Sequence, residues 1–318
     1  MSALEVWNFV IGSETVGALT IVILVFFVIK SIHDSSQRKI EAIKNNERIR
    51  HLTVELAKPW QSNIAPENIK KEVRLLAREI QNPKTADDFF LKGYAFQMEN
   101  NHSESTKYFE KAIGKKPDFA EAYYGMGFAF QKIEKYRNAI PYYQKATMFK
   151  PDYTNAYFNM GYSHQELGNP HEAIQSYQKV IGMKTDNLTA MAYNNMGIEY
   201  YGINNDANAL QSFQKAIVAD PDFAAAYNNM GYSNQESGKP GKALQYYQKA
   251  IGLKSDYADA HYNMGVTLET LGDHSKATEC FQKAKEIANS TPQKNKKNDE
   301  FSSLLKNYTF FTNKINKV

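Results

Sequence analysis

Residues 190–197 read AMAYNNMG, and residues 224–231 read AAAYNNMG. The glycine that closes each of these stretches recurs with similar neighbours along the chain, at Gly93, Gly127, Gly161, Gly197, Gly231 and Gly265. Successive glycines are 34 residues apart, except for one interval of 36. A period of this length predicts a stack of helical hairpins, because a single hairpin can bury its apolar face only against neighbouring copies.

Each repeat carries two apolar stripes with the three- and four-residue spacing of a helix. In residues 120–153 the first stripe is Tyr123, Met126, Gly127 and Phe130, and the second is Ala139, Tyr143 and Ala146. Glycine and alanine let the two backbones approach closely, and the aromatic rings fill the space around that contact. At the turn between the helices, Gly168 and Gly238 suit a left-handed backbone, which predicts the end of the first helix there.

These stripes resemble the tetratricopeptide repeat family, and the resemblance covers residues 86–291. It implies an all-α, right-handed superhelical solenoid of about six helix-turn-helix units, whose first helices line a concave groove. The six units are 86–119, 120–153, 154–189, 190–223, 224–257 and 258–291. The two residues beyond the usual period lie near Asn187 and Leu188, at the end of the third unit.

Residues 16–29 form an uncharged apolar run, VGALTIVILVFFVI. A membrane span needs about 20 apolar residues, and Trp7 and residues 9–11 can extend the run toward that length. We therefore predict a single transmembrane helix within residues 1–30, which contacts the lipid bilayer through residues 10–30. A secretory signal peptide and a buried core helix are the alternatives. The first 29 residues contain no Lys or Arg, whereas a signal peptide begins with positive charge.

Lysine and arginine follow the apolar run and do not precede it. Because cytoplasmic flanks carry the excess of these residues, the N-terminus is expected outside and the repeats in the cytoplasm. The membrane would be the plasma membrane, or the inner membrane of a bacterium.

Two segments flank the repeats. Residues 31–85 are expected to form a polar helical stalk followed by a capping helix, Pro66 to Ile80, on the first unit. The stripe in residues 34–57 is weak, which fits a solvated stalk or a modest coiled coil. Residues 292–318 are expected to be a polar linker and a capping helix at 299–314, with a docking segment for a partner as the alternative.

Several classes of function find no support in the sequence. A net charge of +4 is too small to indicate nucleic-acid binding. The single cysteine, Cys280, excludes an intrachain disulfide or a thiolate metal cluster. No phosphate-binding loop, dinucleotide motif, HExxH or nucleophile elbow occurs. We therefore expect no enzyme activity and no cofactor.

Lysines recur at one position of the second helices, at Lys111, Lys145, Lys179, Lys215, Lys249 and Lys283. A solvated helix face explains this row, and a ridge that faces anionic lipid is the alternative.

Asparagine precedes the Met-Gly pair in four successive units, at Asn159, Asn195, Asn229 and Asn263. The AYNNMG motif is similar to the repeats of the O-linked N-acetylglucosamine transferase. That resemblance implies that these side chains hold the backbone of an extended polypeptide, since an amide both donates and accepts. The flanking groove residues would be Tyr162, Asn194, Asn228, Tyr232 and Tyr262. The alternative is that the asparagines bridge neighbouring helices.

Together these features predict a membrane-anchored scaffold or adaptor that binds partner proteins in its groove. A targeting receptor for client polypeptides and a non-catalytic subunit of a membrane enzyme are the alternatives. Self-association is left open.

Overall fold

The computed structural model describes residues 47–52, 67–183 and 186–290, with five isolated residues between 30 and 37. These residues are helical wherever they have regular structure, which confirms the predicted all-α class. A leading helix, α3 (Glu67–Glu79), precedes six helix pairs. The pairs are α4 (Ala86–Met98) and α5 (His102–Lys115), α6 (Ala120–Lys132) and α7 (Tyr136–Phe149), α8 (Thr154–Glu166) and α9 (Pro170–Gly182), α10 (Asp186–Gly202) and α11 (Asp206–Ala219), α12 (Ala224–Glu236) and α13 (Pro240–Leu253), and α14 (Ala258–Thr270) and α15 (His274–Ser290).

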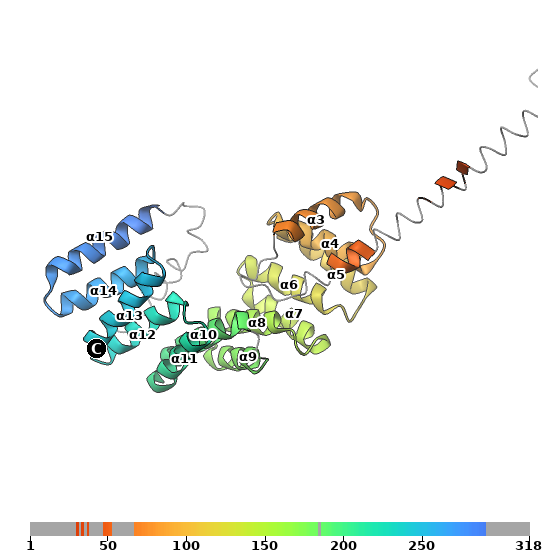
Figure 1. Cartoon of the computed structure of the whole chain (residues 1–318). Coiled ribbons are helices and arrows are strands. Elements are labelled where there is room, and N and C mark those ends of the chain that lie inside the picture. Colours follow the sequence, from red (N-terminus) through yellow and green to blue (C-terminus); the bar gives the residue numbers. More distant parts are fainter. Residues whose placement is uncertain are drawn as a thin grey trace, which may run out of the picture.

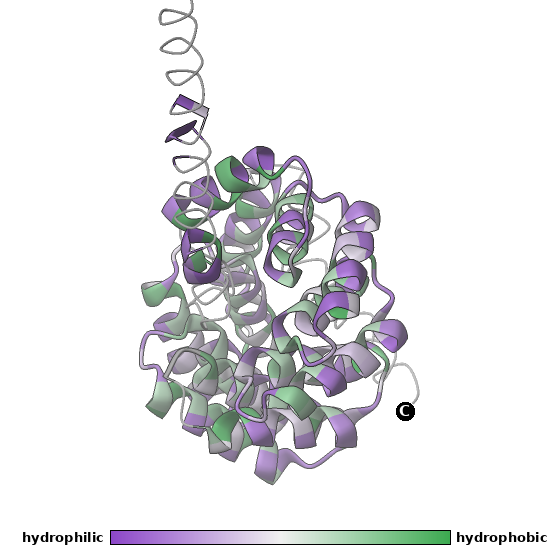
Figure 2. Cartoon of the chain, turned by 90° about the vertical axis from the view of Figure 1, so that its right-hand side faces the viewer, coloured by the Kyte–Doolittle hydropathy of each residue, from purple (hydrophilic) through white to green (hydrophobic). Residues whose placement is uncertain are grey.

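The pairs stack in chain order into an arc that runs from α3 to α15 (Figure 1). Each helix packs on its partner and on the helix that follows it. The first helices of neighbouring pairs also touch one another, from α4 through α6, α8, α10 and α12 to α14. This contact places the first helices on the tighter, inner side of the stack. Seen from the side, hydrophilic residues are frequent along the outward-facing helix surfaces and turns (Figure 2).

The periodic glycines are required by contact with an aromatic ring of the same unit. A Cβ atom at Gly197 would lie 2.6 Å from the ring of Phe213, and one at Gly127 would lie 2.7 Å from the ring of Tyr143. Gly161 and Gly231 stand in the same relation to Tyr177 and Tyr247. Any larger residue would have to displace a fully buried ring, which explains why glycine marks the period.

The turn between the two helices of each unit contains one residue in the left-handed conformation. Gly168 and Gly238 both have φ of 70°, as the sequence predicted. Gly272 has the same role. In the other three units this position is not glycine and φ is still positive, at Asn100, Glu134 and Asn204. The turn geometry is therefore set by the repeat, and a side chain tolerates it where glycine is missing.

A buried hydrogen bond closes three of the units internally. The hydroxyls of Tyr177 and Tyr247 donate to Oε1 of Gln165 and Gln235, at 2.8 and 3.1 Å. Tyr143 donates to Gln131 in the same way. In the first unit the ring is Phe109, which has no hydroxyl, and Oε1 of Gln97 is buried without a partner.

The two residues beyond the period lie inside a helix. We expected them at the end of the third unit, but α10 begins at Asp186 and extends the first helix of the fourth unit by a turn. Leu188 explains the difference. Its side chain is 1% exposed and lies in the same core cluster as Phe158 and Tyr177, so the added turn buries apolar surface.

At the N-terminal end, α3 covers the first unit with Ile69, Val73 and Leu76, which share a core cluster with Phe90. Residues 47–52 join the same cluster. Ile49 and Leu52 are buried, and Arg48 pairs with Glu72 of α3 at 3.5 Å. A solvated stalk therefore does not describe residues 47–52, because two apolar side chains dock on the cap.

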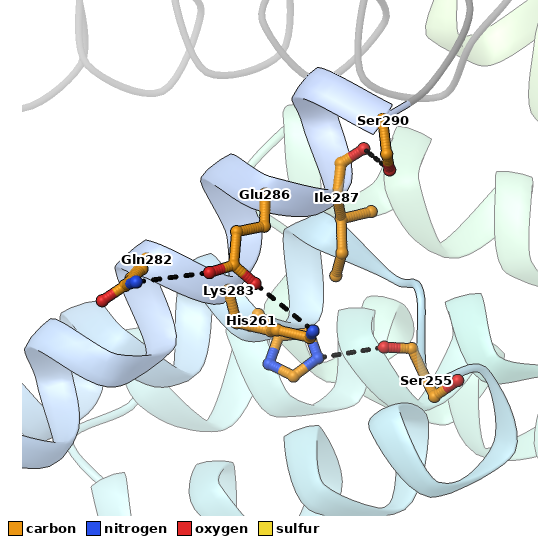
Figure 3. Close-up of polar contacts among 7 residues, drawn as sticks. All are labelled: Ser255, His261, Gln282, Lys283, Glu286, Ile287 and Ser290. Atoms are coloured by element: carbon orange, nitrogen blue, oxygen red, sulfur yellow. Dashed lines mark hydrogen bonds and ion pairs between the residues drawn. The ribbon is translucent and has the colours of Figure 1, made fainter.

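At the other end, the outward face of α15 is polar. Lys283 pairs with Glu286, which also accepts from Gln282, and the hydroxyl of Ser290 donates to the carbonyl of Ile287 (Figure 3). On α14, His261 lies 3.1 Å from the carbonyl of Ser255 (Figure 3). The expected linker and capping helix within residues 292–318 lie outside the described residues.

The predicted membrane span also lies outside them, within residues 1–29. Over the part of the chain that the structure describes, none of the helices has the length and apolar character to cross a bilayer.

Four of the six recurring lysines of the second helices lie near aromatic rings of the first helices. Lys145, Lys215 and Lys249 stand 5.3–5.9 Å from the ring centroids of Tyr123, Tyr193 and Tyr227. Lys111 lies 5.9 Å from the ring of Phe89. An ammonium over an aromatic face is stabilised by the ring quadrupole, so packing within the unit accounts for these four lysines.

Candidate functional site

The candidate site is the side of the stack on which neighbouring first helices touch. Its residues repeat at helical spacing, so that positions four and about eight apart share one face. We call the following set the inner face: Phe158, Tyr162 and Glu166 of α8; Asn194, Ile198 and Tyr201 of α10; and Asn228, Tyr232 and Glu236 of α12. The four asparagines before the Met-Gly pairs adjoin this set and link its helices.

Each of the four asparagines makes a side-chain bond to the preceding unit. Nδ2 of Asn229 donates to Oδ1 of Asn194 at 2.8 Å, and Nδ2 of Asn263 donates to Oδ1 of Asn228 at 3.1 Å. Asn159 donates to the hydroxyl of Tyr124 at 3.0 Å. The partner lies 35 residues earlier in all three cases, so one bond repeats along the stack.

Asn195 departs from this pattern because the residue at the acceptor position of the preceding helix is Phe158. Its amide donates instead to the hydroxyl of Tyr177 at 3.3 Å, and its Oδ1 accepts from Asn194 at 3.4 Å. The structure thus shows the bridging role that the sequence analysis held as its alternative. One of the two amide N–H donors of each asparagine is therefore used between units.

Three of these side chains keep an acceptor. Within the described part of the chain, no group donates to Oδ1 of Asn159, Asn229 or Asn263. None of these oxygens is among the fully buried polar atoms that lack a partner, so each retains contact with solvent. Binding of a polypeptide at these oxygens stays a prediction.

Tyrosines flank the asparagines in pairs. The rings of Tyr162 and Tyr136 meet edge to face with centroids 6.1 Å apart, and those of Tyr232 and Tyr201 do so at 5.6 Å. Tyr262 packs on Phe281 at 5.4 Å. Burial raises the pKa of the Tyr162 hydroxyl, and the nearby Glu166 carboxylate adds to the effect. These phenols therefore remain neutral donors at physiological pH.

Residues Asn159, Asn194 and Asn228 are buried, whereas the other six predicted site residues are half-buried. The structure brings Asn194 to Asn229 and Asn228 to Asn263. It does not place Tyr262 in a tyrosine pair.

Sequence reasoning missed Glu199 on α10. Its side chain is 9% exposed and has no hydrogen-bond or ion-pair partner among the described residues. Burial raises its pKa to about 7, and the charge of Glu166 on α8 acts in the same direction. Alignment of the units would have found it, because the equivalent residues are small: Ala129, Ser163, Ser233 and Thr267.

The described residues contain no cluster of His, Cys, Asp and Glu side chains suited to a metal ion. Cys280 is half-buried, and burial raises the pKa of its thiol, which lowers its reactivity at neutral pH.

Three models of the tetratricopeptide repeat match the chain, over residues 120–153, 154–187 and 222–290. Among curated proteins none matches this sequence. Solved structures with similar folds include PilW, a widely conserved type IV pilus biogenesis factor. It is 18% identical, with 66% of this chain and 96% of PilW covered at a TM-score of 0.57.

PilF of Pseudomonas aeruginosa is 17% identical, with 70% of this chain and 95% of PilF covered at a TM-score of 0.54. MamA is 26% identical, with 52% of this chain and 95% of MamA covered at a TM-score of 0.46. The likeness to PilW and PilF concerns the fold: a curved stack of helix pairs.

Proposed function

Because residues 120–187 and 222–290 are tetratricopeptide repeats, we propose that this chain is a scaffold that binds partner proteins along its inner face. The partner lies there as an extended segment and contacts several units at once. The chain contributes recognition and no chemistry of its own.

The observation that carries this proposal is the repeated acceptor at Oδ1 of Asn159, Asn229 and Asn263. Each amide is already held by its bond to the preceding unit, so its oxygen is fixed before a ligand arrives. A fixed acceptor loses little side-chain entropy on binding. An extended chain presents backbone N–H groups at regular intervals, so a row of such oxygens would bind it without selecting its side chains.

Site-specific photocrosslinking in cells tests the location of the partner. A photoreactive phenylalanine analogue replaces Tyr162 or Tyr232 on the inner face. The matched controls carry it at Gln178 or Gln248, which are exposed on the second helices α9 and α13. We expect one crosslinked partner from the inner positions and none from the controls. Equal crosslinking from both sides would contradict the proposal.

We also propose that residues 1–30 anchor this scaffold in a membrane, with the repeats in the cytoplasm. The apolar run at 16–29 and the Lys and Arg that follow it support this arrangement. The full-length protein is then expected to stay with the membranes after carbonate extraction. A reporter fused after Val318 is expected to be active only in the cytoplasm. Release by carbonate would refute the anchor, and a reporter active only outside would refute the orientation.

A further inference from the structure

Glu199 is a carboxylate for which the fold provides no partner. It belongs to α10, a helix that contacts both α8 and α12 and stands near the middle of the array (Figure 1). Its side chain is 9% exposed, and no described residue donates to it or pairs with it. The charge that acts on it is that of Glu166, which has the same sign. Burial of a carboxylate without a cation or donor is unfavourable, so the fold alone does not explain this residue.

One equivalent side chain, Thr267, shows a structural role that this position can have. In the sixth unit Thr267 donates its hydroxyl to Oε1 of Gln235 in the unit before. The counterpart of Gln235 beside Glu199 is Gln165, whose Oε1 accepts from Tyr177 just as Oε1 of Gln235 accepts from Tyr247. An ionised carboxylate cannot copy the threonine bond, because it only accepts. Glu199 therefore does not serve as the bridge that its position supports elsewhere.

We give the name strip to six residues of three consecutive first helices, within which Glu199 interacts with the charge of Glu166: Tyr162 and Glu166 of α8, Glu199 and Tyr201 of α10, and Tyr232 and Glu236 of α12. Tyr162 and Glu166 of α8 lie within hydrogen-bonding reach of each other. Tyr201 lies on α10, two residues after Glu199. Tyr232 and Glu236 of α12 repeat the pair of α8, since both helices carry the sequence GYSxQE. The helix segments that carry the strip contain no Lys or Arg; they are residues 158–166, 194–202 and 228–236.

The oxygens of Glu199 remain open to a ligand. Neither is among the fully buried polar atoms that lack a partner, although the side chain as a whole is nine-tenths buried. A charged group that reaches this carboxylate would be largely shielded from water. An ion pair shielded in this way is stronger than one at the protein surface. Aromatic rings beside the carboxylates add attraction for a cation.

We propose that this strip, centred on Glu199, binds a lysine or arginine side chain of the extended partner segment. This inference rests on the proposed function, and it adds a side-chain requirement to binding through the partner's backbone. The basic group forms the ion pair that Glu199 lacks in the free protein, with Glu166 beside it. The partner's register along the array is then set at α10.

The test compares two fluorescent peptide libraries on the purified full-length protein. Both contain short random extended peptides without acidic residues, with arginine at the central position of one library and citrulline at that of the other. Citrulline has nearly the shape of arginine, with a neutral urea in place of the charged guanidinium. Anisotropy titrations at pH 8 are expected to give about tenfold or more tighter binding of the arginine library.

Two variants separate the site from its surroundings. Glu199→Gln is expected to reduce the preference for arginine to less than about twofold. Glu110→Gln is its matched control, because Glu110 is exposed on α5, and it is expected to keep the full preference. Circular dichroism confirms that both variants are folded.

Each other outcome overturns a defined part of the proposal. Equal binding of both libraries to the wild type would refute the basic-residue site and leave the scaffold function in place. A preference that survives in Glu199→Gln would refute the assignment to this residue. If neither library binds the wild type, recognition of extended segments fails as well.

Discussion

Asn229 donates its side-chain amide to Oδ1 of Asn194 at 2.8 Å, across the boundary between two repeats. The bond joins two first helices and leaves the second acceptor of the pair, Oδ1 of Asn229, turned to solvent. One residue type thus holds neighbouring units together and offers a polar group to a ligand.

Asn229→Ala is expected to destabilise the array. Oδ1 of Asn194 would lose its donor while its side chain stays 5% exposed, and a buried acceptor without a partner costs about 1–3 kcal/mol. Denaturant titration followed by circular dichroism measures the change. The double variant Asn194→Ala/Asn229→Ala is expected to cost less than the sum of the single variants, because the pair shares one bond. Strictly additive costs would show that the bond contributes nothing.

Phe109→Tyr is expected to stabilise the first unit by about 1 kcal/mol, since the new hydroxyl can donate to the unpaired Oε1 of Gln97. Tyr177 and Gln165 already show this geometry at the same separation of 12 residues. The matched control is Phe213→Tyr, in a unit with Tyr201 in place of the glutamine. A gain from both variants, or from neither, would contradict the explanation.

Glu134→Gly is expected to raise the free energy of unfolding by about 1 kcal/mol, because Glu134 has φ of 59° and a left-handed backbone is costly for a residue with a side chain. Gly168→Ala is the reciprocal change at the same turn of the next unit, where φ is 70°, and it is expected to destabilise by a similar amount. Thermal melts of both variants check the signs. A destabilised Glu134→Gly would mean that the side chain has a role at this turn.

Glu199→Gln is expected to stabilise the protein at pH 8 and to change little at pH 4. The pKa of Glu199 is raised from 4.5 to about 7 in the folded state. The folded protein therefore holds this proton more tightly than the unfolded chain, and stability is lost as the pH rises through that range. The full loss is about 3 kcal/mol above pH 7.

The charged and ionisable groups that interact with Glu199 are Glu166 on α8 and Tyr177 on α9, so their protonation is included in the comparison. Glu110→Gln, the exposed control on α5, is expected to show no such pH dependence. Equal effects of Glu199→Gln at both pH values would mean that the carboxylate is not perturbed by burial.

The helix pairs were predictable because two features recur together every 34 residues or so: a glycine such as Gly197, and the aromatic ring that it contacts in the second helix of its unit. The start of α10 was not predictable. The residue count shows that two residues are added between units, but it does not show which helix they lengthen. Burial of Leu188 decided that point. Glu134 was not predicted at a left-handed turn, because local preference points away from it and the repeat geometry prevails.

The asparagines were predicted as residues of one face, and their neighbours along α8, α10 and α12 follow from helical spacing. Their donor bonds were not predicted, because the residue type gives the capacity to donate and accept but not the partner. Bonds such as that of Asn263 to Asn228 join neighbouring first helices, a role that the residue type alone does not specify. Glu199 escaped notice because its burial depends on the packing of neighbouring units, which the residue's place on one helix does not give.

The Tyr177–Gln165 bond lies within one unit, whereas the Asn229–Asn194 bond spans two. This difference bears on how the array can evolve. A unit that moves by gene duplication takes its tyrosine and glutamine with it, so its internal bond survives any change of neighbours. An asparagine moves without its acceptor and is satisfied only beside a unit that supplies one. The fifth unit carries both a donor, Asn229, and an acceptor, Asn228, so a copy of it can be inserted singly beside a similar unit, whereas Phe158 at the acceptor position of the third unit interrupts the row.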